Sequence, residues 1–344
     1  MMTAGPSRPG RHLQGDWKGK LPRRTEPGTK VAGEAVIIDL PSTDLLRVEG
    51  KGRSRRARSV TPYLFLLIPV ALLAIFTYVP MVETFALSAY NWDGFSQSGI
   101  TFVGLQNYID FFTKPELFGV FFVSLYYLAG AFVQIALALY LATLLSSRTR
   151  FRNLFKGIIF FPYLLNGVAI SFIFFYFFQP GGVLDSFLSI FGADPQNNPL
   201  WLGDRSLINI SLTFVSVWRY MGLNFILFLG AIQSIPPETL EAAQMDGANK
   251  WQELRYIIIP GIRPILALSL ILAIAGSLSV FEIPYIMLDG ANGSSTFVIQ
   301  TVHTAFKFHE YGLATAMAAV LLVIILIVTW LQRRLISDEP VELI

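Results

Sequence analysis

The chain contains no cysteine, and only 14% of its 344 residues are charged. The lack of cysteine excludes disulfides, thiolate catalysis and Cys-ligated zinc or iron–sulfur sites. The low charge argues against an ordinary globular enzyme, since soluble domains carry about 25% charged residues. Apolar residues make up 53% of the chain instead. They form several runs of about 20 residues, the length with which an α-helix crosses a bilayer. We therefore expect a polytopic membrane protein.

Residues with catalytic or metal-binding chemistry are also scarce. The three histidines, His12, His303 and His309, are not spaced as metal ligands. No Gly-x-x-x-x-Gly-Lys-Ser/Thr phosphate loop occurs in the sequence, so any ATP has to be hydrolysed by a different chain. We expect no catalytic residue, no metal site and no cofactor bound by this chain.

The apolar runs predict six membrane-spanning helices. They lie at 63–87, 118–145, 157–178, 207–232, 265–288 and 312–331. These runs are too long and too uniformly apolar to be β-barrel strands, so the fold class is all-α integral membrane. Between the third and fourth spans, apolar residues spaced as on one helix face predict a short helix along the outer membrane surface.

The basic residues indicate which side each loop faces. With the N-terminus inside, 22 of the 26 Lys and Arg lie in cytoplasmic segments and three lie outside. This bias is the one that cytoplasmic loops show, so both termini are expected in the cytoplasm. We predict three regions: a disordered basic tail over 1–60, a six-helix domain over 61–335 and a short cytoplasmic tail over 336–344.

Five of the bases form a cluster, from Lys51 to Arg58, that directly precedes the first span. Nucleic-acid binding is the alternative for such a cluster. We favour a role in holding this end of the span in the cytoplasm and in contacting anionic lipid, and we expect no nucleic-acid partner.

The cytoplasmic loop over 233–263, between the fourth and fifth spans, is longer than the others and has its own pattern. Pro236 and Pro237 suit the start of a helix, where a missing N–H costs little. Gly247 then interrupts the helical pattern, and an amphipathic stretch follows as far as Pro260. The loop therefore predicts a helix–turn–helix that another protein surface can approach.

The spacing within this loop resembles the EAA loop of binding-protein-dependent ABC importer permeases. The matching residues are Glu241, Ala242, Ala243, Asp246, Gly247 and Pro260. Ile259 stands where the family usually has Leu. Trp251, together with the stretches 102–108, 201–204 and 230–236, resembles the carbohydrate-uptake branch of the maltose and multiple-sugar type. The resemblance covers about residues 60–335.

The resemblance implies a type I importer fold and a division of labour. Two permease subunits, here expected to be a heterodimer, form the pathway in the cytoplasmic membrane of a bacterium or archaeon. Two ATPase subunits use ATP and Mg and dock on the EAA loops, and an extracytoplasmic solute-binding protein delivers the substrate. The substrate is expected to be a di- or oligosaccharide, and the matching loop residues are expected to couple this chain to its ATPase.

Polar residues inside the fourth span are candidates for the pathway, because polar groups in hydrocarbon are costly. Asn209, Thr213, Ser216, Tyr220 and Asn224 form one stripe at helical spacing, bordered by Trp218 and Arg219. Packing against a neighbouring helix is the alternative. Two further faces repeat at similar spacing, one in the second span and one in the third. They are formed by Tyr126, Gly130 and Gln134, and by Tyr163, Gly167 and Ser171.

Glu282, in the fifth span, is a candidate partner for Arg219. On straight helices the two residues differ in depth by about 9 Å at a rise of 1.5 Å per residue. An ion pair therefore needs an offset or a kink, which Pro284 can supply. Contact of Arg219 with the substrate is the other possibility.

Three other functions remain as alternatives. One is a permease of the same family for glycerol-3-phosphate or another polar solute. An ion-coupled secondary transporter often shows inverted repeats, but the sequence has no visible repeat. A membrane enzyme such as a lipid-linked glycosyltransferase needs acids or histidines clustered near one interface, and the acids here are scattered.

Overall fold

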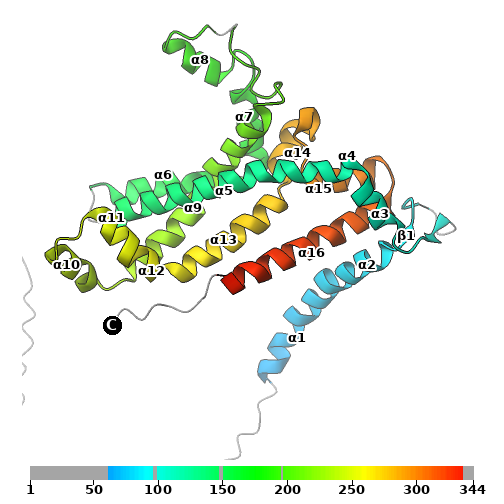
Figure 1. Ribbon diagram of the computed structural model, residues 1–344, viewed down its shortest axis with the longest axis horizontal. Helices are drawn as coiled ribbons and strands as arrows, with labels where there is room; N and C mark the ends of the chain where they lie inside the picture. Colours follow the sequence, from blue (N-terminus) through cyan, green and yellow to red (C-terminus); the bar gives the residue numbers. More distant parts are fainter. Residues whose placement is uncertain (1–60, 96–98, 147–149, 195–196, 336–344) are drawn as a thin grey trace, which may run out of the picture. The chain divides into compact units, whose positions relative to one another are not determined.

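The computed structural model describes residues 61–95, 99–146, 150–194 and 197–335 (Figure 1). The predicted tails over 1–60 and 336–344, and the basic cluster of the first tail, lie outside these residues. The described part is almost entirely helical. Its one strand pair, β1 (Tyr90–Asn91) and β2 (Thr101–Phe102), is antiparallel, with Tyr90 opposite Phe102.

The helical segments follow the predicted runs. In the N-terminal half they are α1 (Thr61–Leu73), η2 (Ala74–Tyr78), α2 (Val79–Leu87), α3 (Gln106–Thr113), α4 (Pro115–Phe118), η4 (Gly119–Phe122), α5 (Val123–Ser146), α6 (Arg152–Leu164), α7 (Gly167–Phe177) and α8 (Val183–Ile190). In the C-terminal half they are α9 (Ile208–Gln233), α10 (Pro237–Met245), α11 (Lys250–Glu253), η5 (Leu254–Ile258), α12 (Ile259–Gly261), α13 (Arg263–Leu278), α14 (Glu282–Leu288), η6 (Ala291–Gly293), α15 (Phe297–Val302), η7 (His303–Lys307) and α16 (Tyr311–Leu335).

The all-α membrane fold is confirmed. Five helical stretches are long and apolar enough to cross a bilayer, and a sixth candidate is a bent pair. The five stretches are Tyr63–Leu87, Pro115–Ser146, Ile208–Gln233, Arg263–Leu288 and Tyr311–Arg334. The location of both termini in the cytoplasm stays a prediction.

The predicted third span is not one straight helix. Its two halves, α6 and α7, meet at an angle of 96°. Leu165 is extended at the junction, and the side chain of Asn166 accepts a hydrogen bond from the backbone N–H of Val168 at 2.8 Å. Asparagine is among the best helix N-caps, so a new helix starts here inside the apolar run.

Helices α5 and α9 form the centre of the packing and lie side by side. Helix α6 packs on α9, α13 packs on α5 and α16, and α14 packs on α7 (Figure 1). Gly222 allows α9 to approach α6 closely, because a Cβ there would lie 2.6 Å from the carbonyl oxygen of Ile159 on α6. The first span contributes least, since none of its most apolar window is buried.

Two apolar clusters are formed along the α5–α9 pair. One contains Ile135, Ala138, Phe225 and Phe228, and it continues to Ile258 in the loop between the fourth and fifth spans. The other contains Tyr127, Ile170, Ile208, Leu212, Val215 and Ile283. The two clusters therefore occupy opposite halves of α9, with residues 216–224 between them.

Candidate functional site: a polar cavity between two apolar clusters

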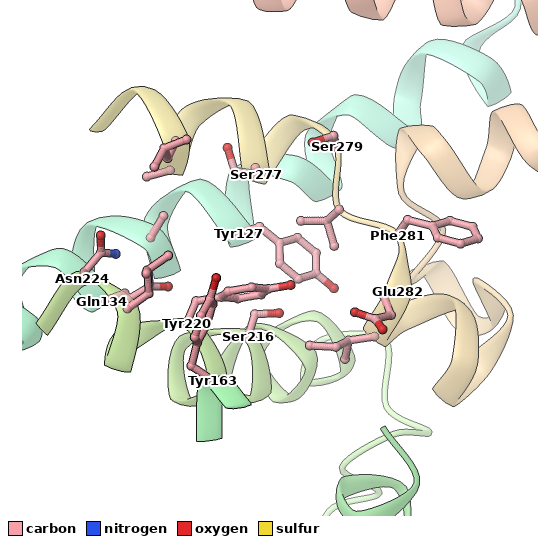
Figure 2. Close-up of a pocket in the computed structure, with 17 residues that line it drawn as sticks. Tyr127, Gln134, Tyr163, Ser216, Tyr220, Asn224, Ser277, Ser279, Phe281 and Glu282 are labelled. Carbon is pink, nitrogen blue, oxygen red and sulfur yellow. The ribbon is translucent and has the colours of Figure 1, made fainter. Parts of the chain in front are cut away.

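A cavity of about 460 Å³ lies in this gap, walled by α5, α6, α9, α13, α14 and the break between the last two (Figure 2). Its polar lining residues are Gln134, Ser216, Asn224, Ser277, Ser279 and Glu282, and its aromatic ones are Tyr127, Tyr163, Tyr220 and Phe281. In Figure 2 the amides of Gln134 and Asn224 lie at one end and Glu282 at the other, with the tyrosines between them. Hydrogen-bonding groups thus flank a row of aromatic faces.

The break in the fifth span shapes one wall of the cavity. Helix α13 ends at Leu278, and α14 begins at Glu282. The carbonyl of Val280, freed by the break, accepts a hydrogen bond from the Thr296 hydroxyl at 2.6 Å. A backbone group without a helical partner is expensive in a membrane, so this bond makes the break tolerable.

The break also brings Glu282 to Arg219. Arg219 Nη1 donates to Glu282 Oε2 at 2.5 Å. The side chain of Arg219 is 12% exposed and that of Glu282 is 41% exposed. Two straight helices would leave the residues at different depths, and the interruption at 279–281 removes that offset. Arg219 also lies over the ring of Tyr220, with 5.1 Å from Cζ to the ring centroid.

Gly167 fits against the same carboxylate. A Cβ at this position would overlap the carboxyl group of Glu282. Gly167 is the first residue of α7, directly after the break in the third span. The two broken spans therefore meet at Glu282.

Several buried polar groups of the cavity have no partner within the protein. Gln134 and Asn224 are 8% and 6% exposed, and their side-chain amides form no hydrogen bond with the residues that the structure describes. The hydroxyl of Tyr127, a residue 4% exposed, is likewise unpartnered in the described part. Such groups are rare in proteins, where most buried polar atoms are bonded, so they are available to a polar ligand.

The structure divides the predicted polar stripe of α9. Ser216, Tyr220 and Asn224 line the cavity. Thr213 instead packs on Gly130 of α5, where its Cγ2 occupies the space of a Cβ. Trp218 packs edge-on against Phe174, at 5.1 Å between ring centroids. The Asn209 amide, beyond the cavity, donates to the carbonyl of Gly293 at 3.1 Å.

The sequence-based selection missed Tyr127, Ser277 and Phe281. On α5 the lining residues are Tyr127, Ala131 and Gln134, which have the spacing i, i+4, i+7 of one helix face. The face predicted for the second span pairs Gln134 with Tyr126, which is 43% exposed and outside the lining. Counting back by seven from Gln134 finds Tyr127. Phe281 carries no local signal, because it enters the wall only through the break.

The loop between the fourth and fifth spans forms the predicted helix–turn–helix. Helix α10 begins at Pro237, Gly247 turns the backbone with φ of +83°, and Asn249 and Gln252 form a reciprocal capping box at the start of α11. Glu241, Ala242, Asp246 and Gly247 are exposed, whereas Ala243 and Pro260 are half-buried. A shallow hollow of about 280 Å³ follows the turn, lined by Asp246, Gly247, Ala248, Gln252, Tyr256 and Ile257.

A different buried carboxylate lies in the loop between the third and fourth spans. Asp185 of α8 is 2% exposed. It accepts hydrogen bonds from Trp201 Nε1 at 2.9 Å, Asn198 Nδ2 at 2.9 Å and the Gly181 N–H at 2.8 Å. The Trp201 bond, aided by the other two, lowers the pKa of Asp185. The helix predicted in this loop is present, and its location on the membrane surface stays a prediction.

Comparison with known proteins identifies the family. Residues 134–338 match the model of the binding-protein-dependent transport system inner membrane component family. A probable ABC transporter permease protein of Bacillus subtilis, YurN, is 32% identical over 289 residues, covering 82% of this chain and 98% of its own. The multiple sugar-binding transport system permease protein MsmF of Streptococcus mutans is 31% identical over 274 residues, covering 79% and 93%.

The fold is also that of a solved transporter. A chain in the crystal structure of a bacterial alginate ABC transporter, in complex with an alginate pentasaccharide-bound periplasmic protein, superposes with a TM-score of 0.72. Its identity to this chain is 22%, and the match covers 83% of this chain and 97% of that one. This chain is a transporter subunit, not an enzyme, and separate ATPase subunits hydrolyse ATP. It belongs to the binding-protein-dependent transport system inner membrane components, as a permease of the sugar ABC transporter branch.

Proposed function

We propose that this chain forms half of the translocation pathway of an ATP-driven importer for a di- or oligosaccharide. Its expected partners are a second, non-identical permease subunit, two ATPase subunits and an extracytoplasmic solute-binding protein. ATP and Mg are used by the ATPases, and this chain binds no cofactor. The importer lies in the cytoplasmic membrane of a bacterium or archaeon, with both termini of this chain inside.

The central cavity supports the proposal that the substrate is a di- or oligosaccharide. Unpartnered amides and hydroxyls, next to the faces of Tyr163 and Tyr220, suit the hydroxyl groups and C–H faces of a sugar ring. Relatives named for arabinooligosaccharides and for starch degradation products, 29% and 27% identical, support a glycan. Another polar solute is the second candidate, because one relative, at 31% identity, is named for uptake of osmoprotective compounds.

The exposed helix–turn–helix supports coupling to an ATPase through Glu241, Ala242, Ala243, Asp246, Gly247 and Pro260. Large apolar side chains around the turn are open to contact, with Met245 89% exposed and Trp251 65% exposed. Such side chains are available to the surface of a partner protein. The turn itself depends on Gly247, whose positive φ disfavours any residue with a Cβ.

The coupling proposal is tested with Glu241→Lys and Gly247→Leu in the assembled importer. We expect sugar uptake to be lost, with the chain still inserted in the membrane, because the surface that meets the ATPase is altered. Glu238→Lys is the matched control, since it makes the same charge change on an exposed residue of α10 outside the motif. Retained ATPase subunits together with normal substrate-stimulated hydrolysis in both variants would show that the coupling role is wrong.

A further inference from the structure

The cavity presents one sign of charge to its contents. Among the described residues that line it, Glu282 alone is charged. Its partner Arg219 is outside the lining and is much less exposed, at 12% against 41% for the carboxylate side chain. A solute in the cavity therefore meets the negative partner of the ion pair, while the positive partner is behind it.

The carboxylate of Glu282 is held in place, and only one of its two oxygens accepts a hydrogen bond from the described residues. Arg219 donates to Oε2, and Oε1 receives no hydrogen bond from the residues that the structure describes. Gly167 leaves room for the carboxyl group, which a Cβ at that position would overlap. Arg219 is itself held, because its guanidinium lies over the Tyr220 ring. One carboxylate oxygen is thus fixed at the cavity wall with its acceptor capacity free.

This arrangement discriminates among solutes by charge. An anion in the cavity meets the more exposed, negative member of the ion pair, and it would have to displace that carboxylate to reach the more buried Arg219. A cation has to compete with Arg219 for the carboxylate. A neutral solute with hydroxyl groups can donate to Oε1 without either penalty, because a carboxylate accepts strong, charge-assisted hydrogen bonds.

We propose that Glu282 is a specificity-determining residue that accepts a hydroxyl of a neutral glycan and excludes solutes bearing a carboxylate or phosphate. Arg219 is a positioning residue that holds the carboxylate. The proposal rests on the proposed sugar pathway and narrows it, since it disfavours glycerol-3-phosphate.

The test measures binding to the purified importer, without its solute-binding protein, in lipid nanodiscs. Saturation-transfer NMR compares methyl disaccharides with the derivatives in which one C6 hydroxymethyl group is oxidised to a carboxylate. Omitting the binding protein removes its own selectivity from the result. The wild-type importer is expected to prefer the neutral member of a pair by about ten-fold, a modest charge repulsion across the cavity. Glu282→Gln is expected to bring the two within about three-fold.

Two further variants make the result decisive. Glu83→Gln removes an exposed carboxylate of α2, outside the cavity, and is expected to keep the wild-type preference. If Glu282→Gln does not fold because Arg219 loses its partner, the double variant Arg219→Gln/Glu282→Gln leaves no unpaired charge and is expected to lose the preference as well. Neutral preference retained in a folded Glu282 variant overturns this assignment alone. Binding of no disaccharide to the wild type overturns the proposed sugar site, and the assignment with it.

Discussion

Asp185 in the loop between the third and fourth spans and Asn224 in the central cavity are buried to a similar degree, with 2% and 6% of their surfaces exposed. Their hydrogen bonding is opposite. Asp185 accepts three hydrogen bonds from its own loop, whereas the Asn224 side chain has no partner among the described residues. A buried polar group whose bonds are all made stabilises the fold, and one whose bonds are missing leaves its capacity to a ligand. The two regions can therefore be assigned to structure and to recognition by the same criterion.

The largest effect on stability is expected from Asp185→Ala. The substitution leaves the Trp201, Asn198 and Gly181 donors unpaired, which costs about 2–3 kcal/mol for bonds to a charged acceptor. Backbone hydrogen exchange in α8, measured in nanodiscs, is expected to accelerate. If hydrogen exchange in α8 stayed as slow as in the wild type, Asp185 would not stabilise its loop, and the contrast between this loop and the cavity would be wrong.

Asn224→Ala and Gln134→Ala are expected to show the reverse pattern. Neither side chain has an intramolecular partner to lose, so the melting temperature of the importer should stay at the wild-type value. Uptake of the transported sugar is expected to fall by about ten-fold for each variant, as for one lost hydrogen bond to a ligand. A large drop in melting temperature with normal uptake in the surviving protein would assign these amides to the scaffold.

Acid is expected to destabilise the loop that contains Asp185, and to do so only at low pH. Hydrogen bonds from Trp201, Gly181 and Asn198 lower the folded-state pKa of Asp185. The resulting stability is fully present above the unfolded value of about 3.9 and is lost as the pH falls through the lowered folded value. With 5-fluorotryptophan in place of tryptophan, the fluorine resonance of Trp201 should stay constant from pH 7 to 5 and shift only below about 4. Asp185→Asn should lack this shift.

The smallest effect is expected from Asp204→Asn, in the same loop. Asp204 also accepts hydrogen bonds, from the backbone N–H and the hydroxyl of Ser206, but it is exposed. Water can replace those bonds, so neither the melting temperature nor the uptake rate should change measurably. An effect as large as that of Asp185→Ala would mean that burial does not distinguish the two carboxylates.

The sequence predicted the features that depend on local pattern. Runs of apolar residues located the spans, and Pro237 with Gly247 predicted the helix–turn–helix, because each residue acts on its own backbone. The break at Asn166 was not predicted, because its capping signal lies inside an apolar run. In the fifth span, Pro284 signals a possible kink, since it has no N–H for the carbonyl of Val280. This signal does not predict that the interruption extends over 279–281.

The cavity could be predicted only in part for the same reason. Ser216, Tyr220 and Asn224 share one face of a regular helix, and periodicity finds them. Tyr127 was confused with Tyr126, its neighbour about 100° round the helix, since periodicity alone does not fix which face turns inward. The Arg219–Glu282 pair was predicted as a candidate, but its geometry depends on the break at 279–281. The role of Gly167 can be recognised only from the carboxylate that packs against it.

The position of the cavity between the two apolar clusters has an electrical consequence. A membrane voltage falls mainly across material of low dielectric constant, and 100 mV does about 2.3 kcal/mol of work on one elementary charge that crosses it. Here that material is Phe225 and Phe228 on one side of the cavity and Ile208 and Leu212 on the other, all fully buried. Within this subunit, a membrane voltage is therefore expected to fall largely across these few side chains.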